Sequence, residues 1–205
     1  MTRTLAIDCA TEACSVALFE GERLIAGDCR ILGRGHAEQL VPMIAALPGK
    51  GRADRIAVAL GPGSFTGVRV GLAAARALAL AWGAQLVGYP TLPLIAAMAR
   101  AKHSDEPLSV CTTGGHGEWF VQHFAADGAA LGPLASLSPA DAASQCAKLV
   151  AGSQAEALVA LRGSGTALAL WPDARSFALL TPAELTEDTA PLYGRAPDAR
   201  LPGTA

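Results

Sequence analysis

The sequence has little positive charge and no cluster of it. Lys and Arg number 16 against 18 Asp and Glu, which gives a formal net charge of −2 over 205 residues. A protein that binds nucleic acid unaided usually carries a basic face or stripe. The composition therefore argues against direct RNA binding. We expect any RNA that this chain serves to be held mainly by another protein.

Other residue types are also scarce. Asparagine is absent, lysine occurs only at positions 50, 102 and 148, and aromatic residues make up 5% of the chain. We attribute the preference for Arg over Lys to genomic base composition rather than to function. With 51% hydrophobic and 17% charged residues, the chain is expected to be globular, either as one large domain or as two small lobes.

The five cysteines are odd in number, and none follows a C-x-x-C spacing. This argues against a zinc site or a disulfide framework and predicts free thiols in a reducing compartment. The uncharged stretch 77–99 is long enough to cross a membrane, but Gly83, Gly88, Pro90 and Pro93 divide it. Asp8 interrupts the only apolar run near the N-terminus, unlike in a signal peptide. We therefore expect a soluble, cytoplasmic protein without a metal site or a membrane contact.

The first half of the chain predicts a mixed sheet with helices. Three segments at 4–8, 14–20 and 23–30, joined by short turns, indicate consecutive antiparallel strands. Strand–helix units follow, with strands at 55–60 and 85–88 and helices at 35–47, 66–82 and 91–101, the last with Thr91 as its N-cap. This order is typical of a ribonuclease-H-like lobe.

The second half predicts a smaller lobe. A polar segment at 102–107 marks the boundary, and the strands 108–112 and 118–125 form a hairpin pair. Ser138-Pro139 is expected to cap a helix that reaches about Val150, and 157–162 is expected to be a last buried strand. From Pro191 the tail is expected to extend over the surface.

The segment 61–79, GPGSFTGVRVGLAAARALA, joins a predicted strand to an alanine-rich helix. Such a loop can aim backbone N–H groups at an anion, but no Lys-Ser/Thr follows it and its glycines miss the dinucleotide spacing. Ser64 is not in a G-x-S-x-G elbow and has no evident base, so we favour a helix N-cap over a nucleophile. The segment therefore favours docking over chemistry.

Five stretches, at 5–18, 35–44, 61–79, 88–92 and 191–199, resemble the TsaB (YeaZ-like) family. The likeness is dense over residues 4–101 and patchy afterwards. It implies the two-lobed α/β fold of actin-like ATPases, built on ribonuclease-H-like lobes with a reduced second lobe. Residues 1–102 would form the N-terminal lobe with partner-docking helices, and residues 103–205 the smaller C-terminal lobe and extended tail.

The resemblance also implies a role in making threonylcarbamoyladenosine in tRNA. In that family TsaB is the non-catalytic partner of TsaD, which transfers the threonylcarbamoyl group to adenine N6. TsaE, a small P-loop ATPase, associates with the pair. The chain is thus expected to form a heterodimer with TsaD, to support TsaE and to meet tRNA only indirectly. We expect no catalytic residue and no cofactor of its own, with ATP or ADP, if bound, at the interface of the complex.

Small residues recur at three- and four-residue steps along the helix 66–82, which suits close helix pairing. The stripe could pack only on the chain's own sheet, or it could also dock a partner together with the helix 35–47. When the chain is alone, an exposed stripe would favour a homodimer. The predicted partner interface consists of His36, Leu40, Met43, Gly67, Arg69, Gly71, Ala74, Ala75 and Leu78.

Asp8 matches the first of two carboxylates that organise Mg²⁺ in actin-like ATPases. In the second lobe the family commonly has Asp-Ala-Arg-Arg-Gly-Glu, whereas residues 113–118 here are TGGHGE. Because those charges are missing, Asp8 and Thr11 are expected to be at most vestigial nucleotide contacts. Alternatively, Asp8 accepts N–H bonds from its own turn.

None of the four histidines has a metal-like pairing, and for His36 we expect a partner contact or a local hydrogen bond. Two other functions stay open. The glycine loop and Asp8 favour a small-molecule kinase of the same fold, which the missing second acid opposes. A peptidase would need a base near Ser64.

Overall fold

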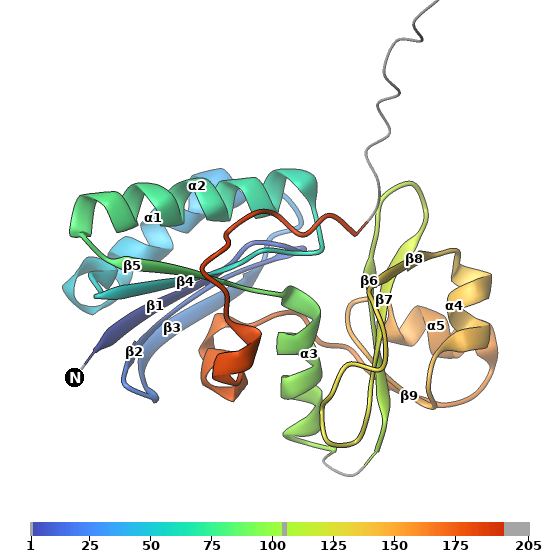
Figure 1. The fold of residues 1–205 in the computed structure, drawn as a ribbon. Coiled ribbons are helices and arrows are strands. Elements are labelled where there is room, and N and C mark those ends of the chain that lie inside the picture. Colours follow the sequence, from blue (N-terminus) through green and yellow to red (C-terminus); the bar gives the residue numbers. More distant parts are fainter. Residues whose placement is uncertain (1, 104–105, 195–205) are drawn as a thin grey trace, which may run out of the picture.

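The computed structural model describes residues 2–103 and 106–194, which form two lobes side by side (Figure 1). Each lobe is built on a five-stranded mixed sheet. The strand order is β3-β2-β1-β4-β5 in the first and β10-β9-β6-β7-β8 in the second. The predicted α/β class and the mixed first sheet are confirmed.

The first sheet begins with three antiparallel strands, β1 (Arg3–Asp8), β2 (Ala13–Glu20) and β3 (Arg23–Ile31). The strands β4 (Arg55–Ala59) and β5 (Gln85–Tyr89) then add in parallel on the other side of β1. Because β1 and β4 lie in the middle of the sheet, their side chains are almost all buried. The five strands predicted for this half of the chain are confirmed.

Two helices, α1 (His36–Ala46) and α2 (Phe65–Trp82), cover one face of this sheet (Figure 1). Leu40, Met43 and Ile44 of α1 share one core with Leu72 and Ala75 of α2. The short turn η1 (Pro48–Gly51) connects α1 to β4. Both helices, and their pairing, are as the sequence predicted.

The helix α3 (Thr91–Arg100) lies between the lobes (Figure 1). Its N-cap position is Pro90, so the prediction that Thr91 caps this helix is wrong. The Thr91 side chain is fully buried instead, and its hydroxyl has no hydrogen-bond partner among the described residues. Pro90 takes the cap position because its extended backbone leads directly from β5 into the first turn.

The second lobe contains the predicted hairpin, β6 (Leu108–Thr113) and β7 (Trp119–Phe124). After β8 (Ala135–Leu137), Ser138 caps α4 (Pro139–Gln145) as expected, by accepting a bond from Asp141 N. The helix ends at Gln145, five residues before the predicted end at about Val150. The apolar run β9 (Leu149–Ala151) is wholly buried and pairs with β6 instead.

The segment predicted as a last strand, 157–162, belongs to a helix, α5 (Ala155–Arg162). That prediction is wrong. Its buried residues, Ala155 and Leu158, are three apart, which is a helical spacing, and Gly163 ends the helix with a left-handed backbone. The strand β10 (Thr166–Leu168) follows and completes the sheet beside β9.

Residues 172–193 leave the second lobe and return to the first; we call them the C-terminal strap. The strap contains two short 3₁₀ turns, η2 (Ala174–Leu179) and η3 (Pro182–Glu184). Phe177 enters the core of the first lobe, with its ring centroid 5.5 Å from that of Tyr89 and 6.0 Å from that of Phe19. Residues 103–205 therefore do not all belong to the second lobe, because this aromatic side chain is buried against the other sheet. The predicted tail from Arg195 onward lies outside the described residues.

Candidate functional site

The turn between β1 and β2, residues 9–12, follows directly after Asp8, the carboxylate for which the sequence left a nucleotide contact open. Asp8 ends β1 and is fully buried. Its Oδ1 accepts a hydrogen bond from Ala10 N at 2.9 Å. The hydroxyl of Tyr89 donates to Ile7 O at 3.0 Å and lies 3.5 Å from Asp8 Oδ2. Asp8 thus accepts an N–H bond from its own turn, which is the local alternative that the sequence left open.

Burial dominates the electrostatics of Asp8. Removal from water raises the pKa of its carboxyl from 3.8 to about 7, although the bonds from Ala10 and Tyr89 act in the opposite direction. Near pH 7 this carboxyl is therefore about half protonated, and its Oδ1 already accepts the bond from Ala10 N.

The same turn is closed by His36 at the start of α1. Its Nε2 lies 2.9 Å from Thr11 O and 3.2 Å from Ala13 O, and the residue is only 8% exposed. The Thr11 hydroxyl is also used locally, since it accepts a bond from Ala13 N at 3.2 Å. Of the two roles expected for His36, the structure shows the local hydrogen bond.

The lobes meet at Glu12. Thr113 at the end of β6 donates from its hydroxyl to Glu12 Oε1 at 2.7 Å. The Thr113 hydroxyl accepts from Gln154 Nε2 at 3.0 Å, and Thr113 N donates to Ser153 Oγ at 3.2 Å. The second carboxylate oxygen of Glu12 is buried and has no hydrogen-bond partner among the described residues.

The hydrogen bonds at this meeting point join one carboxylate to neutral groups. Among the described residues they involve Glu12, Thr113, Ser153 and Gln154, whereas polyphosphate sites commonly use cationic side chains or a metal. Among the described residues, no cluster of three or more His, Cys, Asp or Glu side chains could hold a metal ion.

The glycine segment 61–79 serves packing in this structure. Ser64 caps α2 by accepting a hydrogen bond from Gly67 N at 3.3 Å, as predicted. A Cβ at Gly63 or Gly67 would collide with the carbonyl oxygen of Ala10 or Cys9. These glycines therefore let the start of α2 rest directly on the β1–β2 turn.

The predicted interface residues fall into two groups. His36, Leu40, Met43, Gly67, Gly71 and Ala75 are buried within this chain, so its own sheet and helices cover them. Arg69 is exposed, and Ala74 and Leu78 are half-buried. The small-residue stripe thus packs on the chain's own sheet, and only the second group is open to a partner in this conformation.

Sequence reasoning missed the outer side of the two helices. We call this the outer helical face: the exposed residues Ala37, Val41 and Ala45 of α1 and Ala73, Ala77 and Leu80 of α2. Leu80 is 87% exposed and Val41 59%, high values for apolar side chains. The four-residue steps were a visible signal, but alanine on every side of α2 hid which face turns inward.

A stack of side chains marks the start of α2. The Arg69 guanidinium lies 3.6 Å from the centroid of the Phe65 ring and donates to the Tyr193 hydroxyl at 3.0 Å. The rings of Phe65 and Tyr193 are stacked with their centroids 6.2 Å apart. The end of the strap is thereby fixed to α2.

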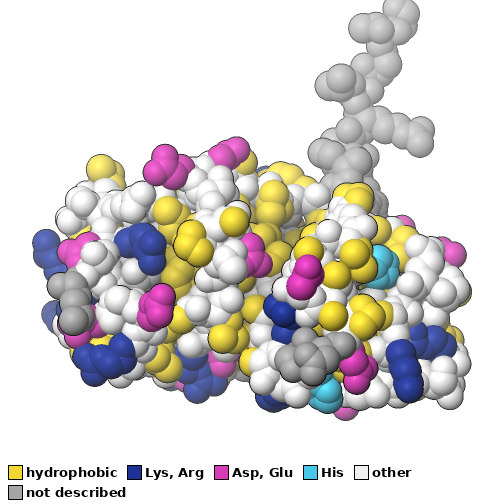
Figure 2. Space-filling view, turned by 60° about the horizontal axis from the view of Figure 1, so that its bottom comes forward, with side chains coloured by type: hydrophobic (Ala, Val, Ile, Leu, Met, Phe, Trp, Pro, Cys, Tyr) yellow, Lys and Arg dark blue, Asp and Glu magenta, His cyan; other side chains and the backbone are white. Residues whose placement is uncertain are grey.

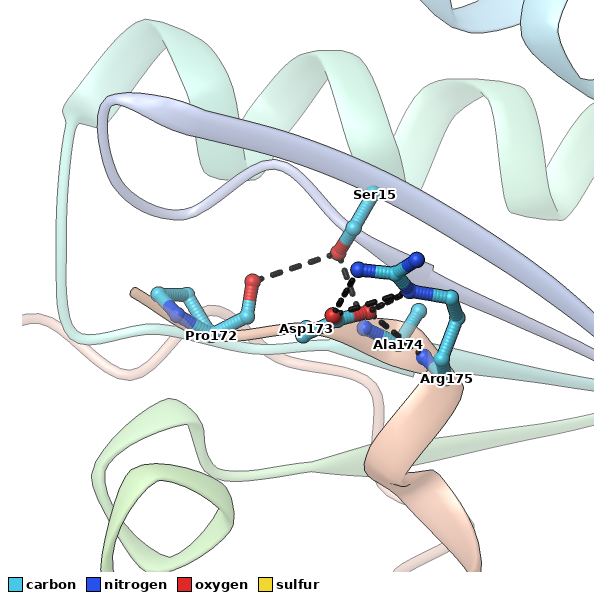
Figure 3. A network of polar contacts seen from close by, with 5 residues as sticks. All are labelled: Ser15, Pro172, Asp173, Ala174 and Arg175. Carbon is cyan, nitrogen blue, oxygen red and sulfur yellow. Dashed lines mark hydrogen bonds and ion pairs between the residues drawn. The ribbon is translucent and has the colours of Figure 1, made fainter. Parts of the chain in front are cut away.

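The strap is also held at the opposite face of the first sheet. Ser15 Oγ donates to Pro172 O at 3.3 Å and accepts from Ala174 N at 2.9 Å (Figure 3). The side chains of Asp173 and Arg175 pair beside it, with Nη2 and Oδ2 2.6 Å apart. The β1–β2 hairpin therefore contacts α2 on one face and the strap on the other.

A family model described as tRNA N6-adenosine threonylcarbamoyltransferase, TsaD, matches residues 30–175. The tRNA threonylcarbamoyladenosine biosynthesis protein TsaB of Escherichia coli is 40% identical over 106 residues, 49% of this chain and 46% of that protein. The tRNA N6-adenosine threonylcarbamoyltransferase of Anaeromyxobacter dehalogenans is 31% identical over 174 residues, 73% of this chain and 52% of that protein. The chain thus spans about half the length of the curated relatives it matches.

Among solved structures, YeaZ from Pseudomonas aeruginosa superposes with a TM-score of 0.79 at 27% identity and covers 94% of this chain and 100% of its own. The ethanolamine utilization protein EutJ from Carboxydothermus hydrogenoformans has a TM-score of 0.52 at 12% identity, covering 88% of this chain and 90% of its own. The latter likeness concerns the fold alone. Together with the two mixed sheets, these neighbours confirm the actin-like ATPase fold.

Proposed function

Because this chain belongs to the TsaD family and is TsaB/YeaZ-like within it, we propose that it acts in tRNA threonylcarbamoyladenosine biosynthesis as the non-catalytic partner of a TsaD-type transferase. The observation that carries the proposal is the outer helical face. It presents exposed apolar side chains on two adjacent helices of the first lobe, and on α2 the exposed residues Arg69 and Arg76 lie among them.

The outer helical face has the properties of a docking surface. The helices α1 and α2 lie next to each other on one side of the sheet (Figure 1), and both turn small apolar residues outward. Small residues let a partner helix approach closely and lose little side-chain entropy on association. Leu80 and Val41 add larger side chains whose removal from water would favour binding by about 1.5–3 kcal/mol each.

Several features support a non-catalytic role. Asp8 is buried and locally bonded, Ser64 serves as a helix cap, and the hydrogen bonds where the lobes meet join one carboxylate to neutral groups. Catalysis would then belong to the transferase. Nucleotide and TsaE would bind to the complex rather than to this chain alone.

We further propose that tRNA reaches this protein only through its partner. The net charge is −2, and on the face shown in Figure 2 basic side chains are interspersed with acidic and hydrophobic ones. Such a surface lacks the strong positive field that gives unaided nucleic-acid binding. In the absence of a partner, the outer helical face of a second copy would cover the first, which gives a cytoplasmic homodimer.

The test replaces Leu80 with Glu. Leu161 lies on the surface of α5, is 57% exposed and provides a matched control at a helical leucine in the other lobe. Ala75→Glu would be unsuitable because Ala75 is fully buried and the variant would unfold. Affinity for the cognate TsaD-type protein and the mass of the isolated chain are measured by calorimetry and light scattering.

We expect Leu80→Glu to weaken the heterodimer by about 100-fold or more, since a buried unpaired charge costs about 3 kcal/mol or more. The same change should convert the homodimer to a monomer, whereas Leu161→Glu should alter neither assembly. Equal binding by the two variants would show that the outer helical face is not the interface.

A further inference from the structure

Two cysteines face each other across the β1–β2 hairpin. The last paired residues of these strands are Asp8 and Ser15, so Cys9 and Cys14 occupy the next opposite positions. Their sulfur atoms are 3.6 Å apart and share a hydrogen bond. Directly opposite residues in an antiparallel pair have Cα atoms about 4.5–5.5 Å apart, which lies within the range that a disulfide spans.

The shared proton makes one thiol more reactive than the other. The bond from Cys9 lowers the pKa of Cys14, whereas the bond to Cys14, together with burial, raises the pKa of Cys9. A thiolate is the nucleophile in thiol oxidation, so Cys14 is the first to react and Cys9 is the nearest thiol to resolve it.

The other three thiols are less suited to this reaction. Burial raises the pKa of Cys29 to about 12, and it also raises the pKa of Cys111 and that of Cys146. Cys29 is nevertheless the most exposed of the five. Exposure alone therefore predicts that Cys29 is oxidised first, whereas the sulfur geometry predicts that the pair Cys9 and Cys14 is.

We propose that Cys9 and Cys14 form a reversible disulfide when the protein meets a small peroxide. The Cys14 thiolate attacks one peroxide oxygen, which gives a sulfenic acid and, after protonation, one water. The Cys9 sulfur then attacks the sulfenic sulfur, and the hydroxyl leaves as a second water. The two sulfur atoms lose two electrons and two protons in all, and hydrogen peroxide is reduced to two molecules of water.

The position of the pair gives this bond a structural effect. Cys9 packs under α2, where its Cβ lies beside Gly71 and its carbonyl oxygen beside Gly67. The turn between the two cysteines carries Glu12, which meets Thr113 of the second lobe. A disulfide would fix the width of this turn and draw together two sulfur atoms directly beneath the start of α2.

Burial limits the size of the oxidants that can reach the two sulfur atoms. Cys9 is 2% exposed and Cys14 0%, so the oxidant must pass through a small opening of the turn or of α2. We therefore expect hydrogen peroxide to oxidise the pair faster than glutathione disulfide does, by at least tenfold at equal concentration. Glutathione disulfide is the bulkier reagent, so Cys14 can attack it only when the turn or α2 opens more widely.

The experiment uses the full reduced chain. It is treated with hydrogen peroxide or glutathione disulfide, quenched with an alkylating reagent and digested with trypsin. One tryptic peptide, residues 4–23, contains both Cys9 and Cys14 and no other cysteine. We expect this peptide to lose two hydrogen atoms and both alkylation sites, and to regain the sites after treatment with dithiothreitol.

Two variants sharpen the test. Cys29→Ser should leave the oxidation unchanged, and Cys9→Ser should replace the disulfide by a sulfenic acid on Cys14 that dimedone traps. The proposal is overturned if Cys29 is oxidised while peptide 4–23 keeps both thiols. It is also overturned if wild-type Cys14 stops at the sulfenic acid with Cys9 still free. The wild-type measurement stands even where a variant folds poorly.

Discussion

Asp8 should make the stability of this protein depend on pH in an unusual direction. Its pKa is raised from 3.8 to about 7 by burial, so the native state binds the proton more tightly than the unfolded chain does. The corresponding stability is fully present below pH 3.8 and is lost as the pH rises to about 7. The difference between these two pKa values corresponds to a free energy of about 4 kcal/mol.

The perturbation is Asp8→Asn. Asparagine cannot ionise, and its side-chain oxygen can still accept the bond from Ala10 N. From about pH 5 to about pH 8 the wild type should therefore lose about 3 kcal/mol relative to the variant, with most of the change below pH 7. The free energy of unfolding of both proteins is measured by urea titration at each pH.

The comparison removes the contribution of the other carboxylates, because both proteins share them. Asp127→Asn provides a matched control: Asp127 accepts a bond from the N–H of Ala129, also two residues on and also at 2.9 Å, but it is exposed. A difference between wild type and Asp8→Asn that stays constant with pH would refute the reasoning. Such a result would mean that the carboxyl of Asp8 has the same pKa in the folded and in the unfolded protein.

Three further substitutions test how the hairpin and the strap are held, each measured by urea unfolding. Phe177→Ala should cost about 3–5 kcal/mol, because it empties an aromatic position in the core of the first lobe; a cost below 1 kcal/mol would show that the strap is not part of that core. Gly67→Ala should cost at least about 1–3 kcal/mol, since its Cβ meets Cys9 O, whereas Gly115→Ala, with open space around it, should be neutral. His36→Ala should cost about 1–3 kcal/mol by leaving two carbonyl groups of the turn without their donor; an unchanged stability would show that water replaces the ring.

The helices and strands of the first lobe were predictable from sequence because the local residue preferences agree there with the pairing of the strands in the fold. Short strand-forming segments in β1 to β3 and the turn at Glu20-Gly21 indicated the hairpins, and glycine-rich loops indicated the parallel units. The helix α5 was mistaken for a strand because a short apolar run fits either element. The end of α4 was missed because the decisive interaction is the pairing of β9 with a strand forty residues earlier.

The candidate site was harder to predict, since it depends on which face of a helix turns inward. Gly67, Gly71 and Ala75 looked like a docking stripe, and small residues do favour close approach. In this fold the close approach is made to Cys9 and the chain's own sheet. The face with Ala77 and Leu80 is rich in alanine as well, and only Arg69 and Arg76 mark it as the outer one.

The packing under α2 supports the proposed role of this chain as a partner protein. Close contact of Gly63 and Gly67 with the β1–β2 turn leaves no room for a larger side chain between helix and hairpin. His36 and Glu12 hold the same turn from α1 and from the second lobe. A turn fixed on these sides positions α1 and α2 relative to the sheet, so the outer helical face is presented in one arrangement. Preorganisation of that kind lowers the entropic cost of association with the proposed partner.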